Sequence, residues 1–194
     1  AVKIAVDMVK EKLISKKEAV LRIDPNSLDT LLHPTLDEKS SINVIANGLP
    51  ASPGAASGKV VFTSEEAERL TGMMQDTILV RVETSPEDIQ GMHAAKGILT
   101  ARGGMTSHAA VVARGMGRPC VSGSSEIDIN YENKSFKTAS IEIKEGEVIT
   151  IDGSTGRIIS GSVATVKPEI SGDFSKLMSW ADSFRKLNVR TNSE

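Results

Sequence analysis

The chain has 194 residues, of which 39% are hydrophobic, 25% charged and only 3% aromatic, and its formal net charge at pH 7 is −2. This composition is typical of a globular protein with one sizeable core. The scarcity of aromatic residues argues against a base-stacking nucleic-acid surface, and the charge gives no reason to expect acidic membranes as partners. Cys120 is the one cysteine, which indicates a reducing, cytoplasmic compartment. No run of about 18 apolar residues occurs, so no membrane span is expected.

The first part of the chain is expected to be a helical arm followed by a linker. Residues 1–33 have the periodicity of amphipathic helices. Ser15, three residues before Glu18, has the pattern of a capping box for a second helix. The stretch 24–34, with a proline near each end, predicts a short third turn. Residues 35–47 are polar and aperiodic, and we predict a linker there.

A compact α/β core is expected to begin at Gly48, where turn-rich segments give way to alternating strands and helices. We predict that Ser64 and Ser85 are N-caps of two helices, the second with Pro86 in its first position. Lys-Glu-Gly and Asp-Gly corners near the end of the core are typical of hairpins. The predicted strands of this region are residues 59–63, 76–83, 97–101 and 118–123.

We therefore predict three parts: a helical arm and linker over 1–47, an α/β domain over 48–162, and a second helical arm over 163–194. The chain begins without methionine inside an expected helix and ends without an obvious finish. We expect it to be a segment of a longer polypeptide.

One of the three histidines stands at the start of a predicted helix, in the stretch GGMTSHAAVVARG. Thr106 and Ser107 are both good N-cap residues, so His108 should lie in the first helical turn. Free backbone N–H groups and the positive end of the helix dipole meet there. This environment disfavours an imidazolium and stabilises an anionic group attached to the ring. The alternative is that His108 only caps the helix or forms a hydrogen bond in the core.

Neighbouring residues support an anion-binding interpretation. Gly103 and Gly104 would allow the backbone to approach a phosphoryl group without a Cβ clash. Arg102 precedes this pair and is a candidate for holding phosphate oxygens. Arg114 lies six residues after His108, which on an ideal helix turns it away from the histidine, so we expect it at the surface or facing another domain.

The motif Gly103, Gly104, Thr106, His108, with the later Ala-Arg pair, resembles the phosphohistidine signature of phosphoenolpyruvate-utilising enzymes. Met105 stands where many members carry arginine, and the stretches GLPASPGAASGKVVFT and ILVRVETSPEDIQGM are also similar to that family. The resemblance is to the dikinase branch, which converts ATP, phosphate and pyruvate into AMP, pyrophosphate and phosphoenolpyruvate. The synthase branch, and a non-catalytic module in which His108 is structural, remain alternatives.

The resemblance implies a swivelling β/β/α phosphohistidine domain that shuttles between an ATP-grasp domain and a phosphoenolpyruvate/pyruvate barrel of the same polypeptide. His108 would be the catalytic phosphoryl carrier, with Gly103, Gly104, Thr106, Ser107 and Arg102 supporting the phosphate. Thr106 also matches a threonine that a regulatory kinase phosphorylates in some members. The family resemblance further implies a homodimeric enzyme that uses Mg²⁺ and a monovalent cation, K⁺ or NH₄⁺, on the other domains. No nucleic acid, membrane or metal ion is expected on this segment.

The sequence gives less support to other nucleotide-binding, thiol or metal sites. The stretch GAASGK, residues 54–59, has three residues between its glycines and no Ser or Thr after the lysine, unlike a Walker A loop. A turn that leads into a strand is the better interpretation, although its glycines could approach His108. Cys120 is expected to be a buried, unreactive thiol. His33 and His93 have no partners at metal-ligand spacing.

Overall fold

The computed structural model describes residues 1–25, 28, 32–37, 42–166 and 172–187. The chain divides into two compact units, one drawn from Ala1–Leu32 with Pro168–Glu194 and the other from His33–Lys167. The predicted third turn, residues 24–34, lies partly outside the described residues.

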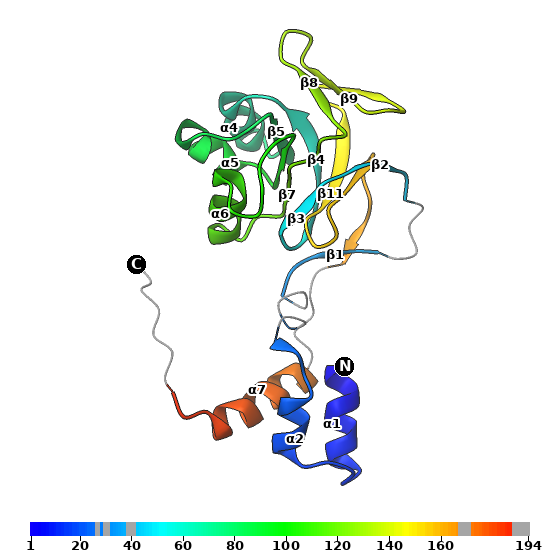
Figure 1. Ribbon diagram of the computed structural model, residues 1–194, viewed down its shortest axis with the longest axis vertical. Helices are drawn as coiled ribbons and strands as arrows, with labels where there is room; N and C mark the ends of the chain where they lie inside the picture. The colour runs from blue at the N-terminus through cyan, green and yellow to red at the C-terminus, as the bar shows by residue number, and fades with distance from the viewer. Residues whose placement is uncertain (26–27, 29–31, 38–41, 167–171, 188–194) are drawn as a thin grey trace. The chain divides into compact units, whose positions relative to one another are not determined.

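The first unit is helical and is built from both ends of the sequence (Figure 1). The helices whose bounds lie within the described residues are α1 (Val2–Lys10), α2 (Lys16–Leu21) and α7 (Gly172–Phe184). Ala5 of α1, Ala19 of α2 and Leu177 of α7 are buried in one core, so each amphipathic helix covers the apolar face of the others. The predicted N-cap is confirmed: the Ser15 hydroxyl accepts a hydrogen bond of 3.1 Å from Glu18 N.

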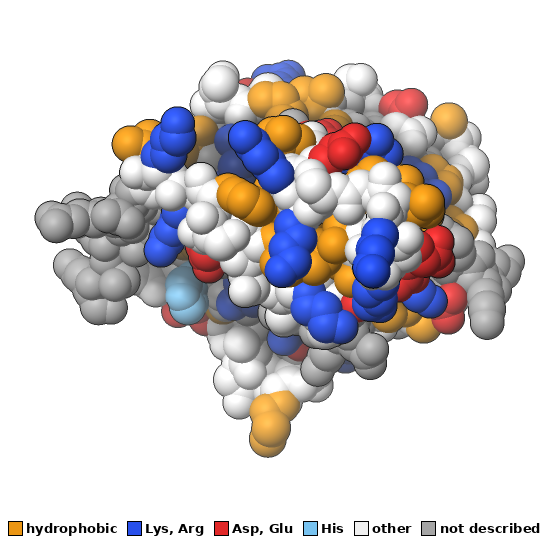
Figure 2. Space-filling view, turned by 90° about the horizontal axis from the view of Figure 1, so that it is seen from below, with side chains coloured by type: hydrophobic (Ala, Val, Ile, Leu, Met, Phe, Trp, Pro, Cys, Tyr) orange, Lys and Arg blue, Asp and Glu red, His pale blue; other side chains and the backbone are white. Residues whose placement is uncertain are grey.

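The surface of the helical unit mixes ion pairs with exposed apolar side chains. Lys10 in α1 and Arg22 at the C-cap of α2 pair with acidic residues three or four positions earlier, a spacing that adds a few tenths of a kcal/mol per pair. Ile4, Leu13 and Leu21 are each more than half exposed. Figure 2 shows hydrophobic side chains interleaved with lysine and arginine on the face seen from below.

The second unit is organised around an eight-stranded sheet with the order β2-β12-β11-β4-β5-β6-β7-β3. Its four central strands, β4 to β7, are parallel, and the flanking strands are antiparallel. The strands are β2 (Val44–Asn47), β3 (Leu49–Ser52), β4 (Ala55–Val61), β5 (Thr77–Arg81), β6 (Gly97–Thr100), β7 (Cys120–Ser122), β11 (Val148–Asp152) and β12 (Arg157–Ser160).

The parallel strands are buried on both faces, which explains their continuous apolar sequences. Leu79 and Ile98 contact the helices on one side, whereas Val80 and Leu99, one residue later, belong to the core on the opposite side. This alternation is the period of two of a β-strand. The helices on the first face are α4 (Ser64–Gly72), the 3₁₀ turn η1 (Pro86–Asp88), α5 (Ile89–Ala94) and α6 (His108–Gly115).

A three-stranded sheet covers part of the opposite face (Figure 1). It has the order β10-β9-β8 and contributes Phe136 and Ile143 to the core. Its strands are β8 (Asp128–Asn130), β9 (Ser135–Lys137) and β10 (Glu142–Lys144). Helices, a large sheet and a small sheet therefore form successive layers, and the predicted α/β fold is confirmed.

Three local predictions need correction. Residues 35–47 are not only a linker: β1 (Thr35–Leu36) pairs with β13 (Thr165–Val166), and β2 pairs with β12 at the edge of the large sheet. The N-cap of α4 is Thr63, which accepts from Glu66 N, rather than Ser64. The Lys-Glu-Gly corner connects β10 to β11, which lie in different sheets, whereas the Asp-Gly corner does join the β11–β12 hairpin.

Gly153 in that hairpin turn gives a direct test of the packing. A Cβ atom at Gly153 would overlap the Ser52 carbonyl oxygen, and it would lie 2.9 Å from Cys120 N. We expect Gly153→Ala to lower the free energy of unfolding by about 3 kcal/mol, because backbone atoms cannot yield as a side chain does.

The control is Gly146→Ala, at a position with a positive φ of 84° but open space around it. Backbone strain alone should cost about 1 kcal/mol there. Urea unfolding followed by far-ultraviolet circular dichroism measures both variants. Equal losses would contradict the predicted overlap at Gly153.

Candidate functional site

The polar residues of the candidate site follow the carboxyl ends of three neighbouring parallel strands. β5 ends at Arg81, β6 at Thr100 and β7 at Ser122. Since these strands are paired in parallel, the loops that follow them emerge at the same edge of the sheet, where α/β proteins bind ligands.

His108 occupies the first position of α6, as the sequence predicts. Ser107 is the N-cap, and its hydroxyl accepts from Ala110 N at 3.4 Å. His108 is half-buried, whereas Ala109 and Ala110 behind it are buried against the sheet. The imidazole therefore lies at the positive end of the helix, where a negative charge is stabilised by typically 0.3–1 kcal/mol.

Thr84 fixes the ring of His108. The Thr84 Oγ1 atom lies 3.0 Å from His108 Nδ1. Whichever of the two atoms donates the hydrogen, Nδ1 is occupied, and no hydrogen bond of Nε2 is found among the described residues. When Nδ1 is the donor to Thr84 Oγ1, Nε2 is the ring nitrogen that is available to react. A neutral imidazole that carries its proton on Nδ1 presents a lone pair at Nε2.

A layer of hydroxyl groups supports the loop in front of the histidine. Ser107 Oγ lies 3.3 Å from Ser122 Oγ, which also accepts a 3.2 Å hydrogen bond from Thr100 Oγ1. Gly103 has a φ of 112°, and a Cβ atom there would lie 2.9 Å from Ser107 Cβ. The backbone of Gly103 thus fits against these hydroxyls only because the residue has no side chain.

Three other predicted site residues lie on the exposed surface of the loop before α6. Gly104 is exposed with open space where its Cβ would be, and Thr106 is also exposed, with the N-cap role belonging to Ser107. Arg102 is exposed as well, while its backbone N donates to Val82 O at 2.9 Å.

Arg114 is exposed, which agrees with the expected surface position. Its guanidinium donates to the carbonyl oxygens of Ala51 and Met105, at 2.8 and 3.2 Å through the same nitrogen. Arg114 therefore ties the glycine-rich loop to strand β3.

The stretch 54–59 lies at the opposite edge of the sheet from the loop that leads into His108. Ala55–Val61 is a strand, and Gly54 and Gly58 approach Pro119 and Asp76, at the amino ends of the parallel strands. A cavity of about 650 Å³ lies at that same amino edge.

Within the part of the chain that the structure describes, there is no helix long and apolar enough to cross a membrane. The same described ranges hold no group of three or more His, Cys, Asp and Glu side chains able to bind a metal ion.

Sequence reasoning missed Thr84, Thr100 and Ser122. Thr84 directly precedes the predicted N-cap Ser85, and the other two lie within the predicted strands 97–101 and 118–123. Their shared signal is position, because each is a hydroxyl residue at or just after the carboxyl end of a predicted parallel strand. That rule applied to neighbouring strands would have grouped them with His108.

Comparison with known proteins shows which family this part of the chain is similar to. The family model described as "PEP-utilising enzyme, mobile domain" matches residues 73–156, which include both Thr84 and His108. That part of the chain is therefore similar to the mobile domain of the phosphoenolpyruvate-utilising enzymes, which confirms the resemblance found in the sequence.

More particularly, the whole chain is similar to pyruvate, phosphate dikinases. It is 60% identical to the enzyme of Rhizobium meliloti (strain 1021) and 56% identical to that of Clostridium symbiosum. It is 54% identical to "Pyruvate, phosphate dikinase 1, chloroplastic" of Arabidopsis thaliana. Each match includes 100% of this chain but only 20–22% of the relative, so the chain spans about a fifth of the length of these relatives.

The availability of Nε2 can be tested with phosphoramidate, a reagent that phosphorylates imidazoles without an enzyme. The wild-type chain should give mainly the Nε2 product at His108, because Thr84 blocks Nδ1. Thr84→Val keeps the shape of the side chain but removes the hydrogen bond, whose net worth of about 1 kcal/mol corresponds to roughly a fivefold shift toward the Nδ1 product. ³¹P NMR separates the two isomers. The product ratio at the exposed His93 is an internal control, and an unchanged ratio at His108 would contradict the assigned role of Thr84.

Cys120 gives a second test, because burial raises the pKa of its thiol to about 12, with a smaller opposing effect of the nearby Arg114 charge. The thiolate is the reactive form, so the folded protein should stay unreactive until the pH approaches that value. At pH 8 we expect Cys120 to react with an aromatic disulfide reagent at least about 100-fold more slowly in the folded than in the urea-unfolded chain. Similar rates in both states would show that the thiol is accessible.

Proposed function

We propose that this chain is the phosphoryl-carrying segment of a pyruvate, phosphate dikinase, and that His108 is the residue that carries the phosphoryl group. The observation on which the proposal rests is the Thr84–His108 hydrogen bond of 3.0 Å at the start of α6, within residues matched to a mobile domain. The names of the most similar relatives support the choice of reaction.

In the proposed first step, the Nε2 lone pair of His108 attacks the β-phosphorus of ATP, and the bond from that phosphorus to the AMP oxygen breaks. Inorganic phosphate then takes the terminal phosphoryl group of the pyrophosphohistidine and leaves as pyrophosphate. The remaining phosphoryl group passes to the enolate oxygen of pyruvate and forms phosphoenolpyruvate, which regenerates His108. A covalent intermediate divides one difficult transfer into easier ones.

Thr84 has a role in both halves of this cycle. When its Oγ1 accepts from Nδ1–H, the lone pair is held at Nε2 for the attack. The same hydrogen bond retains the Nδ1 proton after phosphorylation, and a protonated ring is the better leaving group for onward transfer. The first-turn amides of α6 favour the negative charge of the phosphoryl group.

The donor and the acceptor belong to other parts of the polypeptide in this proposal. An ATP-grasp domain would supply the pyrophosphoryl group and a barrel would bind pyruvate, with this segment swivelling between them in a cytoplasmic homodimer. Mg²⁺ and a monovalent cation, K⁺ or NH₄⁺, would be bound by those domains. The relatives are about five times as long as this chain, which leaves room for both domains.

Thr106 is proposed as a regulatory site. Its side chain is exposed, two residues before His108. A phosphate on Thr106 would add nearly two negative charges beside the histidine and repel an incoming phosphoryl donor. Gly104 and Arg102 are both exposed on the same loop. In the unmodified protein they would contact the phosphate groups of the donor.

Two alternatives make different predictions. A synthase would release phosphate rather than consume it, so the phosphate requirement of the intact enzyme separates it from a dikinase. A non-catalytic module would tolerate the loss of His108.

A chimaeric enzyme tests the proposal. Because the chain aligns over its whole length with the Rhizobium meliloti enzyme at 60% identity, it can replace the matching segment of that enzyme. The chimaera should form phosphoenolpyruvate from ATP, phosphate and pyruvate, and it should retain acid-labile label from [β-³²P]ATP. His108→Ala should lower kcat by about 10⁴-fold or more, because the nucleophile is lost.

His93→Ala is the matched control, since His93 is an exposed histidine on α5, and it should leave the rate within about twofold. Normal labelling of the His108→Ala chimaera would overturn the proposal. Turnover without added phosphate would favour the synthase.

A further inference from the structure

The loop that presents Thr84 to His108 is held in place from both ends. It comprises residues 82–85, between β5 and η1. At its far end, Ser85 N donates to Asp88 Oδ2 at 2.9 Å. The Asp88 carboxylate is itself buried, and it also accepts from Ser64 Oγ at 3.0 Å.

The near end of the loop is held by a residue from a different layer of the fold. Val82 N donates to the hydroxyl oxygen of Tyr131 at 2.8 Å. Tyr131 lies in the turn between β8 and β9 of the small sheet, 49 residues further along the chain. This hydrogen bond therefore links the small sheet to the loop that carries Thr84.

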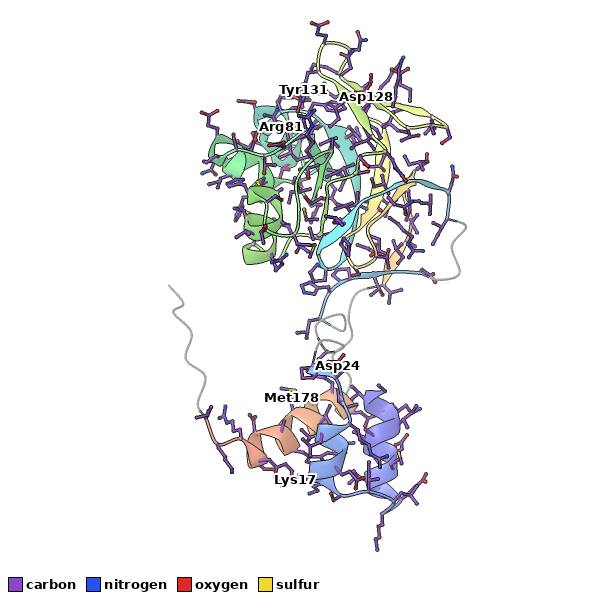
Figure 3. The ribbon with its side chains drawn as sticks, in the orientation of Figure 1. Lys17, Asp24, Arg81, Asp128, Tyr131 and Met178 are labelled. Atoms are coloured by element: carbon purple, nitrogen blue, oxygen red, sulfur yellow. The ribbon has the colours of Figure 1, made fainter. Side chains whose placement is uncertain are left out.

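Arg81 contacts the residues that hold both ends of the loop 82–85. Its guanidinium carbon lies 5.4 Å from the centre of the Tyr131 ring, and its Nε lies 3.4 Å from Asp88 Oδ1. Figure 3 shows the Arg81 and Tyr131 side chains next to each other. In a third contact, Arg81 Nη1 donates to the Phe62 carbonyl oxygen at 2.9 Å, which ties the guanidinium to β4 and its following residue as well as to the loop.

The Tyr131 ring has few alternative positions. The Phe62 ring meets it edge to face, with centroids 6.3 Å apart and planes at 89°, and the cation lies over its face. Such aromatic and cation–π contacts are each worth about 0.5–1 kcal/mol. Although 43% of Tyr131 is exposed, its hydroxyl is thus directed at a backbone amide rather than at water.

We propose that Tyr131 is a positioning residue for His108: it holds Val82 N, and through the loop 82–85 it keeps Thr84 within hydrogen-bond distance of Nδ1. The tautomer of His108, and hence the lone pair at Nε2, depends on a side chain of the small sheet that does not touch the histidine. The consequence for phosphoryl transfer rests on the function proposed above, whereas the consequence for the tautomer does not.

The test is Tyr131→Phe in the 194-residue chain, because it removes one oxygen atom and leaves the ring. With ¹⁵N-labelled histidine, the nitrogen chemical shifts at alkaline pH report the ratio of the Nδ1–H to the Nε2–H tautomer of His108. We expect the wild type to favour Nδ1–H and the variant to lose about threefold to tenfold of that preference. The dispersion of the backbone amide signals checks that the variant is folded.

Thr138→Ala is the matched control. Thr138 Oγ1 both donates to Ile141 O and accepts from Ile141 N, each at 3.2 Å, in the turn between β9 and β10. The variant loosens the same small sheet without touching the loop 82–85, so the tautomer ratio should stay at the wild-type value. An unchanged ratio in folded Tyr131→Phe, or an equal shift in Thr138→Ala, would overturn the proposal.

The chimaeric enzyme separates this inference from the proposed function. There, Tyr131→Phe should lower kcat about threefold to tenfold while the KM for pyruvate stays constant, since pyruvate would bind elsewhere. A chimaera that is active without His108 would remove the proposed function and leave the tautomer measurement intact. A shifted tautomer ratio with an unchanged kcat would show that Tyr131 positions the ring without affecting transfer, and would overturn the kinetic part.

Discussion

The parallel pairing of β5, β6 and β7 is the constraint on which the site depends. In this register, three loops that are far apart in the sequence leave the sheet at one edge. One loop supplies Thr84, the second leads into His108, and the third follows Ser122 at the end of β7. An antiparallel arrangement of the same strands would send alternate loops to opposite edges, and the histidine would lose either its partner or its support.

The chemistry proposed for His108 follows from combining a loop with a helix terminus. A histidine within a helix would have its ring directed by neighbouring side chains, and one on a free loop would sample many rotamers. At the first position of α6 the backbone is fixed by the Ser107 cap, while the ring remains half-buried and reachable. The hydrogen bond to Thr84 then removes one of the two ring nitrogens from competition. In the function proposed above, capping and pairing together select Nε2 as the attacking atom.

The sequence was most informative where the signal is local. Two glycines, an N-cap residue and a run of small residues lie within a dozen positions, so the start of α6 at His108 could be predicted. The two-residue β1 and four-residue β2 were missed because their partners, β13 and β12, lie more than 100 residues away. Thr84 was missed for the same reason: its importance comes from a contact with His108, 24 residues further along the chain.

The pairing of β1 with β13 also has a consequence for how the sheet unit is built into its chain. Thr35 lies opposite Val166 in an antiparallel ladder, so the polypeptide enters and leaves this unit at one point. Because its first and last strands are neighbours, the unit can be regarded as a domain inserted between two segments of the helical unit. Such a domain can be removed or exchanged without cutting any strand of its sheet. The α1, α2 and α7 helices, which come from both sides of that insertion, then form a core of their own.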